Sequence, residues 1–473
     1  MVFSSLIFLF VFLVLNLTIY LLVNDRHKNK VLLVFSLIFY AWGGPKYLLL
    51  LVGETFASWF FALRIQNSQD DRRRKLYMAG ECIVLLGLLG YFKYAVFFLE
   101  NFQALFGIPE VIPNIVLPIG ISFYTFQLLS YVVDVYRGEI HAQPAFWKLL
   151  LYSSLFHQCI AGPIVRYETV ANEIDNRKVT QTDIYVGVRR FCIGLAKKSI
   201  LANSCAAVAD SLILPGSNAL AAQSALGLWL GISAYMLQIY LDFSAYSDMA
   251  IGMGRMVGFR YLENFNYPYI AKSVQDFWRR WHISLSTFFR DYVYIPLGGS
   301  RCSTVKYIRN MAVVWFLTGM WHGASWNYIL WGIYYLVFLL LERFVIKGRI
   351  PGALKYVYTL LVVFFGWAIF KFENLGELGT AFAGLFGIGT NGFIGMDVST
   401  LFLSNIFLLA FSVIACTPLG KMIRQSLLRY GSSNKVAFTV FNITELIVPP
   451  LLLILSVLAL IGNSYNPFLY FQF

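Results

Sequence analysis

Long apolar runs recur along this chain, and they restrict its fold more than any other feature. Of its 473 residues, 59% are hydrophobic and 13% are charged, whereas soluble proteins are about one quarter charged. Many runs approach the ~20 residues with which an α-helix crosses a bilayer, which is longer than a barrel strand needs. We therefore predict an all-α, polytopic membrane bundle. Residues 3–23 lack a basic flank and a clear cleavage site, so we expect a retained first span, with a cleaved signal peptide as the alternative.

Charged loops between the runs indicate orientation. The net charge is +13, and cytoplasmic loops of membrane proteins collect Lys and Arg. Basic segments occur at 24–30, 66–75, 346–355 and 420–435, whereas segments without Lys or Arg occur at 100–114 and 372–398. The pattern predicts roughly 11–12 spans, with the N- and C-termini outside the cytoplasm. Nucleic-acid binding is the weaker interpretation of the positive charge, because no soluble domain exists to carry it.

The cysteines and familiar motifs argue against a metal or a tightly bound cofactor. Six cysteines are scattered along the chain without a Cys-x-x-Cys pair, so we interpret them as small buried hydrophobic residues. No P-loop, nucleophile elbow or His-Glu-x-x-His motif occurs. We therefore predict no metal site and no tightly bound cofactor.

Three regions depart from simple spans. Residues 142–164 are apolar but interrupted by proline, glycine and histidine, which suggests a half-span or a re-entrant helix. Residues 255–310 form the longest polar loop, with a net charge of +6. Residues 311–344 are too short for two full spans, yet the flanking basic loops require the chain to return inside. Two short or tilted helices with a turn at 322–326 satisfy both constraints.

His322 lies at this turn and is the strongest candidate for chemistry. An imidazole in apolar surroundings loses hydration and marks a functional site by default. Gly319, Gly323 and Ala324 permit close backbone approach, and desolvation favours the neutral imidazole that a general base requires. A structural histidine that bridges two helices is the alternative. Tryptophans are expected to supply apolar walls: Trp315, Trp321, Trp326 and Trp331.

His282 is the second candidate and lies in the polar loop. Read as one helix, this segment places Trp278, His282, Leu285 and Phe289 on one face, at spacings of four, three and four. The pattern predicts an amphipathic helix at the cytosolic interface, with the histidine on its protein-facing side. A histidine that only anchors the helix through a hydrogen bond fits the pattern as well.

Polar residues are densest at 242–248, within an apolar run. In a helix, Ser244 and Asp248 share one face, and Asp242 and Tyr246 share another. These residues would line a polar cavity or tunnel, or would hydrogen-bond neighbouring helices. The sequence leaves both interpretations open.

A series of long motifs runs through most of residues 115–335. They are LPIGISFYTFQ at 117–127, IAGPIVRY at 160–167, DFSAYSDMAIG at 242–252, FNYPY at 265–269, the segment 276–299 that begins DFWRRWHISLS and ends IPLGG, and WHGA at 321–324. Together they resemble the membrane-bound O-acyltransferase family, and within it the bacterial branch that O-acetylates alginate and peptidoglycan. Before about residue 115 and after about residue 345, the chain resembles the family only in its hydropathy pattern.

The resemblance implies one membrane-embedded acyltransferase domain over residues 1–473, with core motifs at 115–345. It implies a helical bundle with re-entrant segments and cytosolic amphipathic helices around a central tunnel from the cytosolic donor side to the outer face. His322 would be the essential catalytic histidine and His282 the second family histidine. Residues 325–327, which follow the Trp-His-Gly motif, differ from the residues usual in the family at this place, which puts the detailed shape of the pocket in question. Substrate or tunnel contacts are expected from Asp242, Ser244, Tyr246, Asp248, Arg279, Arg280, Trp281, Trp321 and Asn327.

The expected function is transfer of an acyl group, most simply acetyl, to an extracytoplasmic polysaccharide such as alginate or peptidoglycan. The donor would be a cytosolic thioester, acetyl-coenzyme A or an acyl carrier protein. The +6 loop would attract it, although membrane orientation alone would produce the same charge. Further expected partners are an extracytoplasmic relay or transferase protein and membrane lipid, in a bacterial cytoplasmic membrane. D-alanyl transfer to teichoic acid is one alternative. A transporter or a non-catalytic scaffold for polysaccharide export is another, although a transporter's inverted repeats are not apparent.

Overall fold

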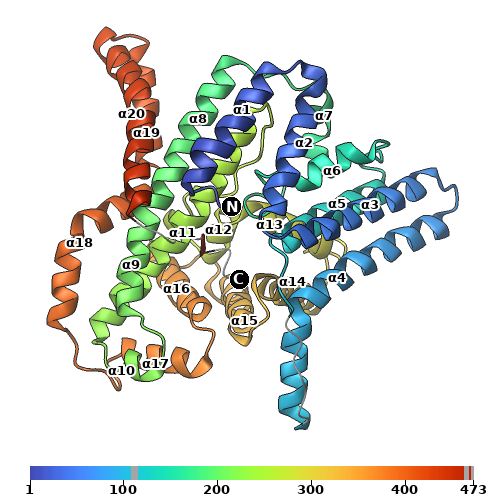
Figure 1. Cartoon of the computed structure of the whole chain (residues 1–473). Helices are drawn as coiled ribbons and strands as arrows, with labels where there is room; N and C mark the ends of the chain where they lie inside the picture. Colours follow the sequence, from blue (N-terminus) through green and yellow to red (C-terminus); the bar gives the residue numbers. More distant parts are fainter. Residues whose placement is uncertain (108–114, 463–467, 470–473) are drawn as a thin grey trace. The chain divides into compact units, whose positions relative to one another are not determined.

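The structure is a computed structural model that describes residues 1–107, 115–462, 468 and 469, and helices are the only regular secondary structure among them (Figure 1). The chain packs as two compact units. Unit 1 comprises Met1–Phe191 and Met249–Glu263, and unit 2 comprises Cys192–Asp248 and Asn264–Phe473. The predicted all-α, polytopic membrane fold is confirmed.

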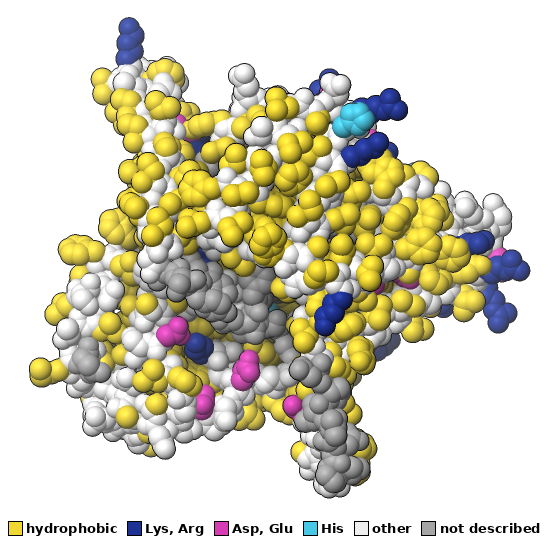
Figure 2. All heavy atoms as spheres, viewed as in Figure 1, with side chains coloured by type: hydrophobic (Ala, Val, Ile, Leu, Met, Phe, Trp, Pro, Cys, Tyr) yellow, Lys and Arg dark blue, Asp and Glu magenta, His cyan; other side chains and the backbone are white. Residues whose placement is uncertain are grey.

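Eight helices in the described part of the chain are long and apolar enough to cross a membrane. The predicted number was higher, roughly 11–12, because it included shorter or more polar helices. The apolar helix at Phe8–Leu22 has only 15 residues, and α14 (Thr304–His322) begins with charged residues. Hydrophobic side chains are dense over the upper and right parts of the face shown in Figure 2, as expected for helices that meet lipid.

Unit 1 contains the helices before the core motifs and the first helices within them. After α6, residues 155–165 form no helix and are buried throughout, which confirms the predicted interruption within 142–164. The segment predicted to be a loop from residue 100 is helical as far as Phe106, and Gly107 ends the helix with a left-handed backbone, φ 66°. The rest of that loop, 108–114, lies outside the described residues. The helices are η1 (Phe8–Phe12), α1 (Leu13–Leu22), α2 (Asp25–Ala41), α3 (Pro45–Asn67), α4 (Asp71–Phe106), α5 (Ile121–Arg137), α6 (Phe146–Ser154) and α7 (Tyr167–Asn176).

Unit 2 contains all the residues that the sequence singled out for chemistry, and its core is rich in buried tryptophan. Two long helices, α8 (Gln181–Ala196) and α11 (Ala225–Met256), contribute residues to both units. The remaining helices are η2 (Lys197–Ala202), α9 (Asn203–Leu212), α10 (Ser217–Ala221), η3 (Pro268–Ile270), α12 (Val274–Arg280), α13 (Ile283–Phe289), η4 (Arg290–Tyr294), α14, α15 (Trp326–Leu341), η5 (Glu342–Ile346), α16 (Leu354–Lys371), α17 (Leu375–Leu385), α18 (Met396–Ala415), α19 (Leu419–Gly431) and α20 (Lys435–Ile461).

Candidate active site

A tight hairpin of α14 and α15 carries His322. The helices are separated by only three residues, Gly323–Ser325, which confirms the two short helices predicted for this region. Two glycines let the backbones touch: a Cβ atom on Gly319 would collide with the Tyr328 carbonyl, and one on Gly332 would collide with the Trp315 carbonyl. His322 is the last residue of α14. The backbone contact between α14 and α15 therefore fixes the position of the His322 Cα atom.

Aromatic rings enclose the His322 imidazole, which is 6% exposed. Trp331, Trp321 and Phe370 meet it edge-on, with ring centroids at 4.9, 5.1 and 5.2 Å. The prediction that Trp326 forms part of this wall was wrong. Trp326 opens α15 and is 50% exposed, and it does not line either cavity that His322 lines.

The helix predicted around His282 is broken, and this part of the prediction was wrong. Helix α12 ends at Arg280 and α13 begins at Ile283, with His282 between them in the left-handed region at φ 44°. A left-handed residue cannot continue a right-handed helix. Even so, Trp278, His282, Leu285 and Phe289 all line one cavity, so the predicted shared face survives the break.

Asn264 holds this break in place, and the sequence gave no signal of its role. The fully buried side chain of Asn264 accepts hydrogen bonds from the Ser284 backbone N–H and hydroxyl, at 3.2 and 2.9 Å. Its backbone carbonyl accepts from the Ile283 N–H at 2.9 Å. These bonds satisfy the first amides of α13, which a helix start leaves without partners.

The His282 imidazole is also buried, at 1% exposure, but it differs from His322 in its polar contacts. Its Nδ1 lies 3.5 Å from the Ser284 hydroxyl, and its Nε2 has no hydrogen-bond partner among the described residues. Burial lowers the pKa of His282 to about 3, so the ring is neutral. Trp321 contacts both histidines, with its ring centroid 5.5 Å from that of His282 and 5.1 Å from that of His322.

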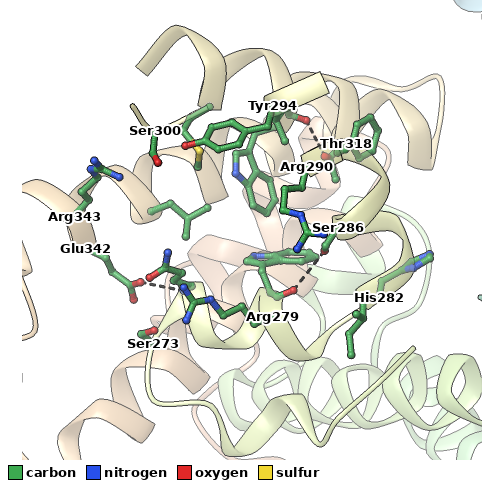
Figure 3. A pocket seen from close by; sticks show the side chains of 18 of the residues that line it. Ser273, Arg279, His282, Ser286, Arg290, Tyr294, Ser300, Thr318, Glu342 and Arg343 are labelled. Atoms are coloured by element: carbon green, nitrogen blue, oxygen red, sulfur yellow. Dashed lines mark hydrogen bonds between the residues drawn. The ribbon is translucent and has the colours of Figure 1, made fainter. Parts of the chain in front are cut away.

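Both histidines line one cavity of about 840 Å³. Figure 3 shows His282 among the residues around it. Glu342 is the acidic residue among its described lining, and its carboxylate accepts the backbone N–H groups of Val274 and Gln275 at 2.6 and 3.0 Å. It therefore anchors the start of α12. Five basic side chains give the cavity a positive lining that favours an anionic ligand: Lys272, Arg279, Arg290, Arg343 and Lys355.

A second, much smaller cavity of about 20 Å³ is also lined by His322. Asp242 lines it and is 2% exposed. The Asp242 carboxylate lies 2.5 Å from Lys198 Nζ and accepts the Leu469 backbone N–H at 2.8 Å. The sequence did not indicate Lys198 or Leu469 as site residues, because both are far from Asp242 along the chain.

The other predicted site residues divide into two groups. Arg279 lines the large cavity, and Trp281 lines the small one. Ser244, Tyr246, Asp248, Arg280, Trp321 and Asn327 are not among the residues that line these two cavities. Several of them hold other groups instead: Asp248 pairs with Lys197 at 2.7 Å, Arg280 with Asp276 at 2.9 Å, and Asn327 donates to the Phe370 carbonyl at 3.0 Å. The roles of these residues in substrate binding, and the continuous tunnel, stay predictions.

Comparison with known proteins places this site in a family. Residues 139–375 match the model of the membrane-bound O-acyltransferase family. The chain belongs to this family. The match contains both histidines and the residues that line the large cavity, so the predicted resemblance is confirmed and the protein is an O-acyltransferase.

Some relatives match this chain along its whole length and indicate a branch of the family. A probable alginate O-acetylase from Pseudomonas aeruginosa is 38% identical over 100% of both chains. A peptidoglycan O-acetyltransferase from Helicobacter pylori is 31% identical over 100% of this chain and 98% of its own. A teichoic acid D-alanyltransferase from Bacillus subtilis is 29% identical, but over 54% of this chain and 69% of its own.

Proposed function

We propose that this membrane-bound O-acyltransferase acetylates hydroxyl groups of an extracytoplasmic polysaccharide, with a cytosolic thioester as the acetyl donor. The observation that carries the proposal is the position of His322, whose buried imidazole lines both the large basic cavity and the small cavity. Relatives named for alginate and peptidoglycan acetylation cover the whole chain, which supports acetyl transfer to a polymer of this class.

His322 acts as a general base in this proposal. The acceptor hydroxyl oxygen attacks the thioester carbonyl carbon, the carbon–sulfur bond breaks, and the hydroxyl proton passes through the imidazole to the departing thiolate. In a second route the imidazole attacks first, the thiol leaves, and the hydroxyl then takes the acetyl group from the histidine. His282 serves either route by positioning the thioester or His322.

The large cavity suits an anionic donor such as acetyl-coenzyme A. Its volume of about 840 Å³ lies within the roughly 300–1,000 Å³ of small-molecule sites. Its five basic side chains can form charge-assisted hydrogen bonds with the phosphate groups of the donor. An acyl carrier protein that inserts its phosphopantetheine arm is the other form of the same donor chemistry.

The membrane orientation follows from the same charges. Basic residues of the cavity come from segments that the positive-inside pattern assigns to the cytoplasm. We therefore propose a bacterial cytoplasmic membrane, with both termini on the outer side. An acetyl group that leaves there passes to the polymer directly or through an extracytoplasmic relay protein.

The test replaces His322 by Gln in the full-length protein, with His141→Gln as a matched control on the surface. Membranes that hold the cell's own acceptor receive labelled acetyl-coenzyme A, and alkali-labile label in the polymer is measured. We expect His322→Gln to lose incorporation, and His141→Gln to keep it, at equal amounts of folded protein. Full incorporation by His322→Gln would falsify the central role of this histidine.

D-alanyl transfer is the second candidate, because a D-alanyltransferase matches just over half of the chain. Mass spectrometry of envelope polymers from cells with and without the gene separates the two. Protein-dependent ester-linked acetate supports the proposal, and protein-dependent D-alanine esters contradict it. The same spectra identify the polymer.

A further inference from the structure

The small cavity beside His322 has a size that restricts which acyl group can react. Its volume of about 20 Å³ leaves room for roughly one methyl-sized group. Since His322 also lines the large cavity, a thioester that reaches the imidazole from there has the small cavity next to its carbonyl carbon. The acyl chain is the part of the donor that would enter it.

Aromatic rings in mutual contact form much of the cavity wall. The centroids of Trp281 and Trp367 are 4.7 Å apart, and those of Trp367 and Phe370 are 5.5 Å apart. Trp281 is 2% exposed and Trp367 is 1% exposed. Packed interiors resist the insertion of extra methylene groups, because neighbouring side chains must leave their preferred rotamers. A longer acyl chain would therefore meet a wall that does not yield.

The charge of the lining restricts the acyl group further. Asp242 is the acidic side chain among the described residues that line this cavity, and Lys198 and the Leu469 N–H already bind its two oxygens. An acyl group with an α-ammonium would be buried here without a carboxylate to pair with. Burial of an unpaired charge is strongly unfavourable.

We infer that the small cavity selects the acyl group, with Trp281 and Trp367 as specificity-determining residues. It admits the methyl of an uncharged acetyl group and excludes longer chains and acyl groups with an α-ammonium. This inference rests on the proposed acetyl transfer and deepens it by naming the side chains that set the acyl class.

The experiment measures donor preference in membranes that hold the cell's own acceptor. Labelled acetyl-, propionyl- and butyryl-coenzyme A are compared for wild type, Trp367→Leu and Trp281→Leu. Loss of several buried atoms should raise the butyryl-to-acetyl rate ratio about tenfold or more, since each methylene is worth roughly that much in discrimination. Ile239→Ala opens the same cavity with a smaller change, so it gives the test if a tryptophan variant does not fold.

Trp229→Leu is the matched control. Trp229 stacks on Phe364 at 4.6 Å and lines a different, apolar groove of unit 2, so its replacement should leave the ratio unchanged. An unchanged ratio in Trp367→Leu and Ile239→Ala, with acetyl transfer intact, would overturn the inference alone. Absence of incorporation from every donor by wild type would overturn the proposed function as well.

A separate comparison of donors tests whether the cavity excludes a charged acyl group. D-alanyl-coenzyme A matches isobutyryl-coenzyme A in size but carries an ammonium group in place of one methyl. We expect Trp367→Leu, whose cavity is enlarged, to use the isobutyryl donor at least about tenfold faster, the scale on which a mismatched polar group is rejected. Equal rates with the two donors would overturn the part of the inference that concerns charge.

Discussion

Lys198 Nζ lies 2.5 Å from Asp242 Oδ1, and both side chains are almost fully buried. Removal of one partner from such a pair leaves a buried charge at a cost of about 3–5 kcal/mol. We expect Lys198→Met to lower the melting temperature strongly, and the double variant Lys198→Met/Asp242→Asn to recover most of it. Asparagine keeps an acceptor for the Leu469 N–H. Melting curves in detergent measure the effect, and equal melting temperatures for the two variants would contradict it.

Gly332 allows α15 to touch α14, so its replacement should disturb both stability and activity. A methyl group there would collide with the Trp315 carbonyl, forcing the helices apart and moving His322. We expect Gly332→Ala to lower the melting temperature and the acetyl transfer rate. Gly87 in α4 is the control, because a Cβ there meets nothing within 4 Å, and alanine in a helix is favoured over glycine by about 0.5–1 kcal/mol. A fall of equal size in Gly87→Ala would count against the steric explanation.

The left-handed backbone of His282 separates two roles of this residue. A β-branched residue at φ 44° is strained by roughly 1–2 kcal/mol, whereas asparagine tolerates this region. We expect His282→Val to be less stable than His282→Asn, while both lose the imidazole and with it most acetyl transfer. Paired melting and transfer measurements test this. If His282→Asn kept the wild-type rate, the imidazole would have no part in the reaction.

The same residue should make stability depend on pH. His282 lies outside the eight candidate spans, and burial lowers its pKa from 6.5 to about 3. Below pH 6.5 the unfolded chain binds a proton that the folded protein does not, so stability falls by about 1.4 kcal/mol for each pH unit. We expect the melting temperature of wild type to fall as the pH drops from 6.5 to about 4.5, and that of His282→Asn to fall less steeply.

Other buried histidines limit how far the pH dependence of the melting temperature can differ between wild type and His282→Asn. His157 is fully buried and His322 is nearly so, and both histidines remain in the variant. The two curves should therefore differ in slope without the variant becoming flat. Parallel curves would show that His282 is accessible to protons in the folded protein.

The α14–α15 hairpin could be predicted because its determinants are local. The length of residues 311–344, the basic loops on both sides and the glycines near His322 all lie within one short segment. The break at His282 could not be predicted, since Asn264 stabilises it from outside the helix pattern. A period of three to four residues describes α12 and α13 separately and gives no sign of the left-handed residue between them.

The small cavity beside His322 could not be predicted from the sequence for a related reason. Its lining joins Asp242 from α11, Trp281, the end of α14, two aromatic residues of α16 and Leu469. Trp367 and Phe370 lie in an apolar run where any aromatic residue fits the pattern equally well. Only the tertiary packing distinguishes the rings that meet His322 from those that meet lipid.

Backbone contact between α14 and α15 makes the placement of His322 all-or-none. Helices that touch through side chains adjust by small repacking, whereas contacts between glycines and carbonyl groups leave no side chain to repack, and the next similar packing lies about one turn away, some 5.4 Å. Such a shift would carry the imidazole away from both cavities. A change in bilayer thickness is then best absorbed by tilting the hairpin as a rigid body, which keeps the contact between His322 and Trp331 of α15 unchanged.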